Sequence, residues 1–264
     1  MVSPNGKPVT ANFETQSRRR LMLETFSLSD TGCIRPNNED YCRVLPDIGL
    51  FLLADGMGGA RGGETASRLA VDTIADTLQT APARDASTLL KAVEESNARV
   101  LDQANRDVRL EGMGTTIVAA LHTGTAEDGT EDVAIASVGD SRAYLYDDAG
   151  LRAVTQDQTW VHEVGKPLGL DEESLRTHPM RHVLTMAIGV GSTLTIKYYM
   201  VGLKPGAMLL LSSDGLHGVA KPAQIEKVLQ ESGTLEQKCR NLIEAARSAG
   251  GPDNISCVLI RATA

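Results

Sequence analysis

Carboxylate side chains stand at the ends of short apolar runs at several separate points of this chain. In each case a strand-like run meets a turn that carries one or two acids, as in FLLADG and MLLLSSDG. The acids concerned are Glu39, Asp40, Asp55, Asp140, Asp214 and Asp253. A single Asp-Gly pair after a strand is usually no more than a turn. The prediction of a site therefore rests on the repetition of acids at strand ends. Strand ends can converge at one end of a β-sandwich, and the sequence therefore predicts a cluster of carboxylates.

Such a cluster has a defined chemistry. Close carboxylates repel and raise each other's pKa unless a cation neutralises them. The set contains no His or Cys, and ligands that are all oxygen favour a hard ion, Mg²⁺ or Mn²⁺, over zinc. Gly56 follows Asp55, and its carbonyl could serve as a further ligand because no side chain hinders close approach of the backbone.

Arg35 lies four residues before Glu39. A guanidinium beside a metal–carboxylate site can fork onto phosphate oxygens. The same group could instead form a salt bridge to one of the acids. The residues alone leave both interpretations of Arg35 open.

Apolar periodicity predicts the elements that must position these residues. The predicted strands are Phe51–Ala54, Thr115–Leu121, Val133–Val138, Ala143–Tyr146, Ala207–Leu211 and Ile255–Ile260. The predicted helices are Ala66–Leu78, Ser87–Val108, Ala223–Leu229 and Leu235–Ala249. Strands and helices do not alternate one for one, which favours antiparallel sheets with helices packed outside over a doubly wound parallel sheet. Residues 161–179, here called the flap, show no clear period and are expected to form a surface loop with a short helix near Asp171–Leu175.

Composition narrows the class of protein. The 264 residues include 26 Lys and Arg against 34 Asp and Glu, a formal net charge of −8, and 42% are apolar. An ordinary apolar fraction excludes whole-chain disorder, and the acidic balance argues against nucleic acid or an anionic membrane as partner. The four cysteines form no C-x-x-C pair and suit reduced thiols. We expect a cytoplasmic monomer, with a flexible leader at 1–22 and one domain at 23–264.

The acidic segments resemble, in chain order, the motifs of the metal-dependent protein phosphatases, the type 2C or PPM family. The segments are SDTGCIRPNNED, ADGMGGARGGETAS, GMGTT, VGDSRAYLY, SSDGL and GPDNIS. TQDQTWVHEV and HPMRHVLTMAIG resemble the stretch between the family's Asp-bearing strands. The likeness runs from about Ser29 to Ile260, and the Met57-Gly58-Gly59 form is similar to the bacterial branch. It implies an α+β fold in four layers, α-β-β-α, with two antiparallel sheets flanked by helix pairs.

The resemblance also implies an activity and its metal ligands. The expected enzyme is a protein-serine/threonine phosphatase in which a hydroxide bridging two Mn²⁺ or Mg²⁺ ions attacks the phosphorus directly. Asp55 would bridge the two ions, with the Gly56 carbonyl on one of them. Asp214 and Asp253 would complete the ligands of the first ion. Asp140, with Asp214, resembles the site of a third and weaker ion.

Other roles and partners follow from the same resemblance. Glu39 would hold the second ion, Asp40 would orient the attacking water, and Arg35 would bind the phosphate. The substrates would be phosphoproteins in bacterial signalling, and the enzyme would reverse a cognate Ser/Thr protein kinase. Intact acids argue against a pseudophosphatase that only binds phosphoproteins, and Arg35 would have no phosphate to bind in a purely structural metal scaffold.

The chain departs from the family pattern at several positions. Animal members carry a proton-donating His after the Asp-Gly, where this chain has Met57. The general acid is therefore unassigned, with a metal-bound water as the first candidate and His182 and His217 as weaker ones. The usual Asp-His-Ser is replaced by Asp157-Gln158-Thr159, and the flap carries GKPLGL at Gly165–Leu170. These changes leave substrate recognition open.

Overall fold

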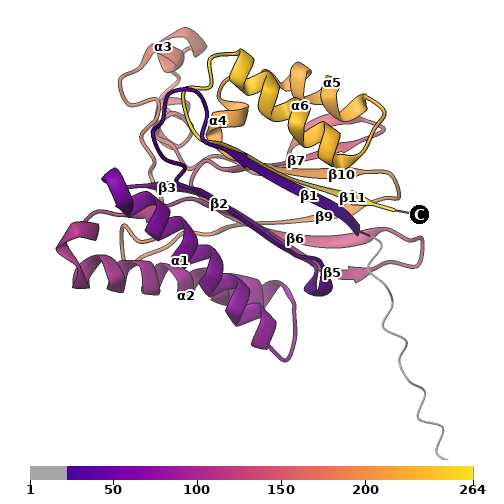
Figure 1. Cartoon of the computed structure of the whole chain (residues 1–264), viewed down its shortest axis with the longest axis horizontal. Coiled ribbons are helices and arrows are strands. Elements are labelled where there is room, and N and C mark those ends of the chain that lie inside the picture. Colours follow the sequence, from indigo (N-terminus) through magenta and orange to yellow (C-terminus); the bar gives the residue numbers. More distant parts are fainter. Residues whose placement is uncertain (1–22, 264) are drawn as a thin grey trace, which may run out of the picture.

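Two antiparallel β-sheets pack face to face, with helices on both outer surfaces (Figure 1). The computed structural model describes residues 23–263, so the leader expected at 1–22 lies outside the described residues. The layers run helix, sheet, sheet, helix, which confirms the fold class predicted from the sequence.

The first sheet has the strand order β1-β11-β10-β7-β8. Its strands are β1 (Leu23–Asp30), β7 (Arg142–Asp147), β8 (Gly150–Ala153), β10 (Met208–Ser212) and β11 (Ile255–Ala262). Leu23 pairs with Ala262 in the register of β1 and β11. Both ends of the described chain therefore lie together, at the end of the molecule marked C in Figure 1.

The second sheet has the order β2-β3-β5-β6-β9, with β4 paired to β3. Its strands are β2 (Asp40–Leu45), β3 (Leu50–Met57), β4 (Gly114–Thr115), β5 (Ile117–Thr125), β6 (Glu131–Val138) and β9 (Lys197–Leu203). Both faces of β3 and β5 are covered, and their residues read as nearly continuous apolar runs for that reason.

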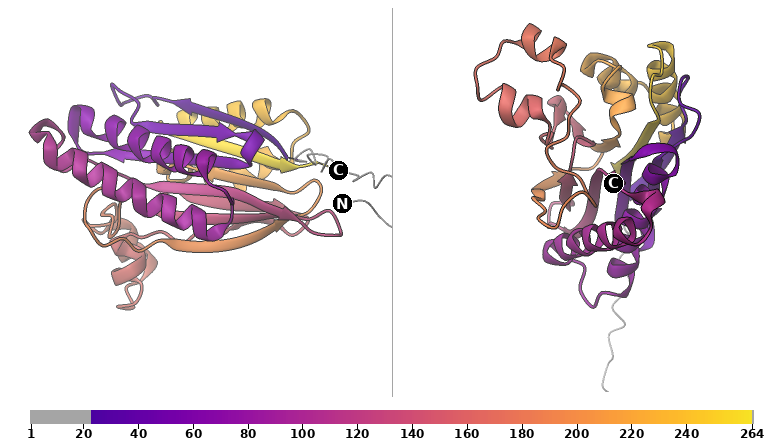
Figure 2. Two further views of the ribbon diagram at one scale, coloured as in Figure 1. Left: turned by 90° about the horizontal axis from the view of Figure 1, so that it is seen from below. Right: turned by 90° about the vertical axis from the view of Figure 1, so that its left-hand side faces the viewer.

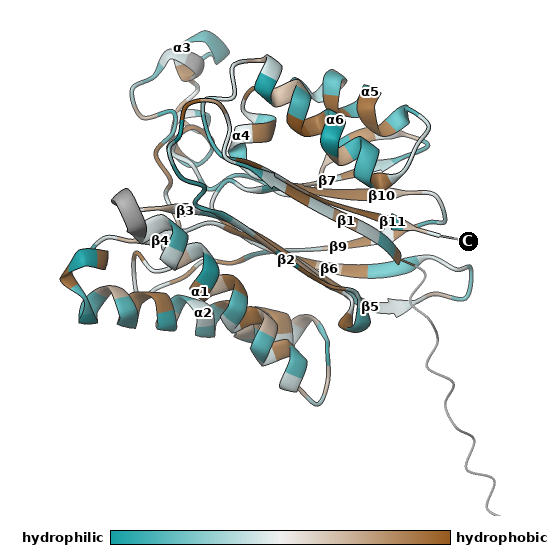
Figure 3. Ribbon diagram, in the orientation of Figure 1, coloured by the Kyte–Doolittle hydropathy of each residue, from teal (hydrophilic) through white to brown (hydrophobic). Residues whose placement is uncertain are grey.

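Helices cover the two outer faces unequally. α1 (Gly59–Thr80) and α2 (Ala86–Arg106) lie on the second sheet. α4 (Asp214–His217), α5 (Pro222–Gln230) and α6 (Leu235–Ser248) lie on the first. Figure 3 shows that their apolar stripes face the sheets and their polar faces are turned outward, as the 3.6-residue period predicts.

Three apolar layers hold the sandwich together. One lies between α1, α2 and the second sheet, one between the two sheets, and one between the first sheet and α5 and α6. Leu52 and Leu53 show how β3 serves two of them, because successive side chains of a strand point to opposite faces. Leu52 packs toward the helices and Leu53 packs between the sheets.

The flap leaves the sandwich at the end opposite Leu23 and Ala262 (Figure 2). It contains the short helix α3 (Glu172–Thr177), as expected from the sequence. It also contains a π-helical turn at Val161–Gly165, which was not expected. The ring of Trp160 stacks on His178 with centroids 4.0 Å apart, and this contact ties the two ends of the flap together. None of the helices in the described part of the chain is long and apolar enough to cross a membrane.

Candidate active site

The predicted acids do converge at one end of the sandwich. The carboxyl ends of β3, β6 and β10 and the segment before β11 meet there, drawn from both sheets; the right-hand view of Figure 2 looks toward this end. They surround a cavity of about 950 Å³. Among the residues that line it are Arg35, Glu39, Asp55, Gly56, Asp140, Asp214 and Asp253.

Asp40 is the one predicted site residue that does not line this cavity. It is the first residue of β2 and pairs with Asp55 of β3 in the strand register, so its carboxylate lies behind the cavity wall with 8% of the residue exposed. Its Oδ2 accepts a hydrogen bond of 2.8 Å from the Ser213 hydroxyl. Burial raises the pKa of Asp40 to about 7, because a charge is costly where water is excluded.

The other central acids are also held in unfavourable surroundings for a charge. Burial, and then the charges of Asp40 and Asp214, raise the pKa of Asp55 well above its ordinary value. Burial raises the pKa of Asp140 to about 7 and also raises the pKa of Asp214. The Oδ1 atoms of Asp40 and Asp214 are buried without a hydrogen-bond partner among the described residues. Buried oxygens of this kind normally have a partner.

Gly56 and Gly63 bring two backbone segments into close approach beside the acids. A Cβ on Gly56 would lie 2.1 Å from the Gly63 carbonyl oxygen, and one on Gly63 would lie 2.5 Å from Oε2 of Glu39. The Gly56 N–H donates to the Glu39 carbonyl over 3.2 Å. The absence of side chains therefore lets α1 begin directly over Glu39, which agrees with the expected close approach of the backbone at Gly56.

Arg35 forms an ion pair with Asp253 in this structure. Its Nη2 lies 2.7 Å from Oδ2 of Asp253, and about half of its side chain is exposed at the cavity rim. The hydrogen bond and charge of Asp253 raise the pKa of Arg35. Of the two interpretations of Arg35 that the sequence left open, the salt bridge is present, and the half-exposed Arg35 also lines the cavity.

Two residues that sequence reasoning did not single out hold the acids in place. Asn254 accepts from the Glu39 N–H over 2.8 Å and donates through Nδ2 to the carbonyls of Thr31 and Asn37. Ser213 donates to Asp40 and accepts from the Ser256 N–H over 2.9 Å. Both stand beside acids, in PDN and SSD, and that adjacency was the available signal.

Thr116 fixes Asp55 by its backbone. Its hydroxyl accepts from the Asp55 N–H over 3.0 Å, and its own N–H donates to the Asp55 carbonyl over 2.9 Å. The hydroxyl also lies 2.7 Å from that of Ser141. This chain of contacts links the Asp55 strand end to the turn that carries Asp140.

The structure separates the candidates for a proton donor. Met57 lines the cavity and has no proton to give, whereas His182 lines the same cavity. Nδ1 of His217 lies 2.9 Å from the Ser212 hydroxyl, and burial holds the pKa of His217 well below its ordinary value. His217 does not line the cavity of the acids, so His182 is the better placed of the two histidines.

The donor set fits divalent ions. Within the described residues no three His, Cys, Asp or Glu side chains form a ready-made metal cage. The same residues supply several carboxylate oxygens on one cavity, and one of them, Oδ1 of Asp214, is buried without a hydrogen-bond partner among the described residues. Unneutralised oxygens in this number match what a hard cation requires.

The comparisons with known proteins agree with this geometry. Residues 36–259 match the family described as Protein phosphatase 2C, and the chain belongs to that family. It is 35% identical over 240 residues to the serine/threonine phosphatase stp of Listeria innocua, covering 88% of this chain and 93% of that protein. The chain is accordingly a serine/threonine protein phosphatase, which acts on phosphoproteins.

Solved structures support the same assignment. The Mycobacterium tuberculosis serine/threonine phosphatase PstP/Ppp superimposes with a TM-score of 0.82 at 32% identity, covering 92% of this chain and 99% of that one. The catalytic domain of PstP in complex with two manganese ions gives a TM-score of 0.80 at 31% identity, covering 92% and 99%. The family is metal-dependent, and that relative holds its metal as manganese.

Proposed function

We propose that this phosphatase transfers the phosphoryl group of phosphoserine and phosphothreonine directly to water, using two Mn²⁺ or Mg²⁺ ions, and so reverses a Ser/Thr protein kinase. The observation that carries the proposal is the single cavity onto which Asp55, Asp214, Asp253 and Glu39 converge. When bound there, the ions supply the Lewis-acid chemistry that makes water nucleophilic near neutral pH.

The acids divide into two groups around the proposed ions. Asp55 occupies the centre, at the end of β3, where the charges of four other acids raise its pKa: Asp40, Asp214, Asp140 and Asp253. Asp214 and Asp253 lie on the first-sheet side of it, and Glu39 lies on the other, below Gly63. This arrangement supports Asp55 as the shared ligand, with Gly56 contributing its carbonyl. Asp140, beside Asp214, supports a third and weaker site.

Asp40 would act on the attacking water from behind Asp55. Its Oδ2 is fixed by Ser213, which leaves Oδ1 as a buried acceptor without a described partner. A carboxylate with one oxygen fixed and the other free can orient water and accept its proton. The prediction that Asp40 orients the water thus gains a physical basis.

Arg35 would bind the phosphate. Its guanidinium stands at the cavity rim, half-exposed, and a planar fork of N–H groups matches two phosphate oxygens. The contact neutralises charge on the phosphoryl group during transfer. The chain has no Cys in a C-x5-R loop, so a thiol-based phosphoenzyme has no support.

The test asks whether water attacks the phosphorus directly or a phosphorylated protein forms first. The protein is given a phosphothreonine peptide and Mn²⁺ in water enriched in ¹⁸O, under single-turnover conditions. Direct transfer predicts no phosphorylated protein at any time. The one ¹⁸O atom expected in each released phosphate shows that water supplied the oxygen, which hydrolysis of a phosphoenzyme would also give. A phosphorylated protein that forms and decays at the rate of turnover would contradict direct transfer. An Asp148→Asn variant, changed at an exposed turn between β7 and β8, serves as the matched control.

A further inference from the structure

A second cavity adjoins the catalytic one. Its volume is about 500 Å³, and it shares Asp140, Asp214, His182 and Gly218 with the wall of the first. Its remaining walls come from β7, from the segment before the flap, from the flap, from the turn that follows it and from α4. A chain that places its phosphate in the first cavity therefore brings its neighbouring side chains to the second.

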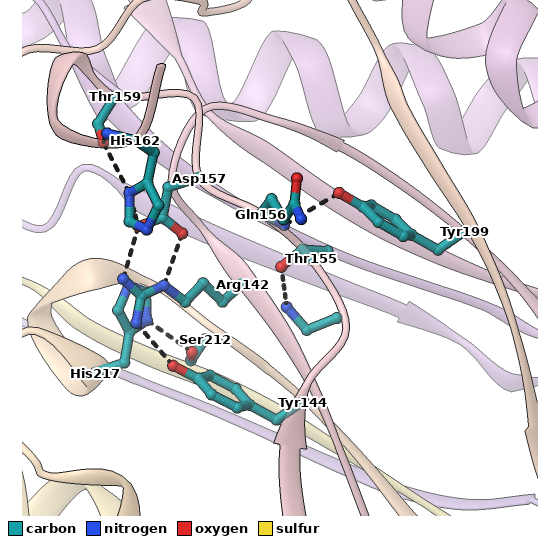
Figure 4. Close-up of polar contacts among 11 residues, drawn as sticks. Arg142, Tyr144, Thr155, Gln156, Asp157, Thr159, His162, Tyr199, Ser212 and His217 are labelled. Carbon is teal, nitrogen blue, oxygen red and sulfur yellow. Dashed lines mark hydrogen bonds and ion pairs between the residues drawn. The ribbon is translucent and has the colours of Figure 1, made fainter. Parts of the chain in front are cut away.

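The floor of the second cavity is a buried ion pair (Figure 4). Arg142 donates from Nε and Nη2 to the two carboxylate oxygens of Asp157 over 2.7 and 2.6 Å, and from Nη1 to the Tyr144 hydroxyl over 2.9 Å. His162 lies above the pair, with Nδ1 3.6 Å from Oδ2 of Asp157. A bidentate pair of this kind is rigid. It is also neutral as a unit, so the floor carries no free charge.

The free charge of the second cavity lies on its outer walls. Burial lowers the pKa of His162, so this side chain is neutral near pH 7. Lys166, from the flap, and Arg181, from the turn after it, line the cavity. Neither of these two cations has an ion pair to any residue that the structure describes; Arg181 makes one long hydrogen bond, 3.4 Å, to the His178 carbonyl.

The acids near these cations are mostly engaged elsewhere. Asp157 is matched by Arg142, and Asp140 and Asp214 belong to the proposed metal site. Glu172, at the start of α3, is the remaining acid in the lining. With Asp140 and Asp214 neutralised by the proposed ions, two unpaired cations against one acid leave the lining of this cavity positive, in a protein whose formal net charge is −8.

We propose that the second cavity is a subsite for an anionic side chain of the substrate, an aspartate, a glutamate or a second phosphorylated residue, close in sequence to the residue being dephosphorylated. The inference rests on the proposed function and adds to it a preferred class of substrate. Lys166 and Arg181 act as specificity residues, because they meet the neighbouring side chain and not the scissile phosphate.

The test compares phosphothreonine peptides that carry Asp, Asn or Lys at each flanking position in turn. At one position the wild-type protein should prefer Asp over Asn by about two- to fivefold in kcat/KM, the range for an exposed charge pair. The preference should fall as salt is raised, since exposed charges are screened. A peptide with phosphoserine at that position separates the two sources of negative charge. Its kcat/KM should exceed that of the Asp peptide if a second phosphate binds the subsite better than a carboxylate does.

Substitutions of Lys166 and Arg181 test whether the second cavity causes the preference for Asp over Asn. Lys166→Gln and Arg181→Gln should each reduce the ratio of Asp to Asn, and the double variant Lys166→Glu, Arg181→Glu should reverse it toward Lys. Lys204→Gln removes the same charge from an exposed site between β9 and β10, at the opposite end of the sandwich, and should keep the wild-type ratio.

Two results would overturn the subsite. One is wild-type turnover without any preference for Asp over Asn at every position. The other is a preference that Lys204→Gln reduces as much as Lys166→Gln does, which would show long-range attraction without a subsite. A protein that turns over neither the peptides nor p-nitrophenyl phosphate with Mn²⁺ would instead overturn the proposed function, and this inference with it.

Discussion

Burial and neighbouring carboxylates disfavour the charged form of the central acids of the site. Asp55 is the extreme case, since it is buried and faces the charges of Asp40 and Asp214. A side chain in that position destabilises the metal-free protein and becomes favourable when cations neutralise the cluster. The charge on Asp55 therefore favours metal binding and lowers the stability of the metal-free protein.

Asp55→Asn should lower kcat/KM on a phosphothreonine peptide by more than about a hundredfold, because the proposed shared ligand loses its charge. The same change should raise the melting temperature of the metal-free protein by about a few degrees at pH 8, because carboxylate repulsion falls. Calorimetry and circular dichroism measure the second effect. A loss of activity together with a circular dichroism spectrum that differs from that of the wild type would show that Asp55 is structural.

Ser213 provides a second prediction at this scale. Ser213→Ala removes the hydrogen bond to Asp40 and leaves the Ser256 N–H without its acceptor. We expect kcat to fall by about tenfold or more and the free energy of unfolding to fall by about 1–3 kcal/mol. Ser248→Ala, at an exposed position on α6, is the control. Unchanged kcat in Ser213→Ala would contradict the role given to Asp40.

The sequence predicted the acids of this cluster and could not predict what holds them. Glu39, Asp55, Asp140, Asp214 and Asp253 were visible as a repeated pattern of acids at strand ends. The contacts of Asn254 and Ser213 join residues far apart in the chain, so periodicity and spacing carry no trace of them. Whether each acid serves the proposed role is a separate matter that the mutants above address.

At the scale of elements, the start of α1 is what brings Glu39 and Gly56 together. Gly63→Ala would place a Cβ 2.5 Å from Oε2 of Glu39 and 2.8 Å from the Gly56 backbone carbon. We expect a weaker apparent affinity for Mn²⁺, by about tenfold, even though alanine favours the helix. Activity titrated with Mn²⁺ measures the shift.

Gly62→Ala is the matched control, since its Cβ would meet the Met113 side chain at 3.1 Å and no site residue. Both variants gain the same helix propensity. Equal Mn²⁺ affinity in the two variants would show that the close approach at Gly63 does not position the site.

Periodicity predicted the long elements well and the irregular ones poorly. The predicted helix Ala66–Leu78 lies within α1, whose Gly-rich first turn has no apolar stripe to reveal it. The predicted strand Thr115–Leu121 is divided at Thr116, where hydrogen bonds to Asp55 interrupt the ladder. β1 and β9 were missed because their side chains are mostly half-buried or exposed, which blurs alternation.

At the scale of the whole molecule, the buried acids make stability depend on pH. Asp40 and Asp140 have pKa values of about 7, and those of Asp55 and Asp214 are also raised. Unfolded carboxyls titrate near 4, so the folded state binds more protons between these values. The free energy of unfolding of the metal-free protein must therefore fall as pH rises through 7.

We expect the melting temperature in EDTA to drop between pH 6.5 and pH 8, and Mn²⁺ to reverse much of that drop. Below about pH 6.5 the partly buried His162 and His217, whose pKa values are lowered, act in the opposite direction. Above pH 6.5 the change in melting temperature therefore reports the titration of the acids alone. Asp40→Asn should flatten the slope there, and a slope equal to the wild type would remove Asp40 from the cause.

The central claim is that converging carboxylates make this fold a metal-dependent phosphatase, and one titration tests it most directly. The metal-stripped protein is supplied with a phosphothreonine peptide, and phosphate release is measured against added Mn²⁺ beside the bound metal content. The account predicts negligible release without metal and turnover that rises as about two ions bind per chain. Full turnover after exhaustive chelation, with metal analysis showing no bound ion, would contradict it.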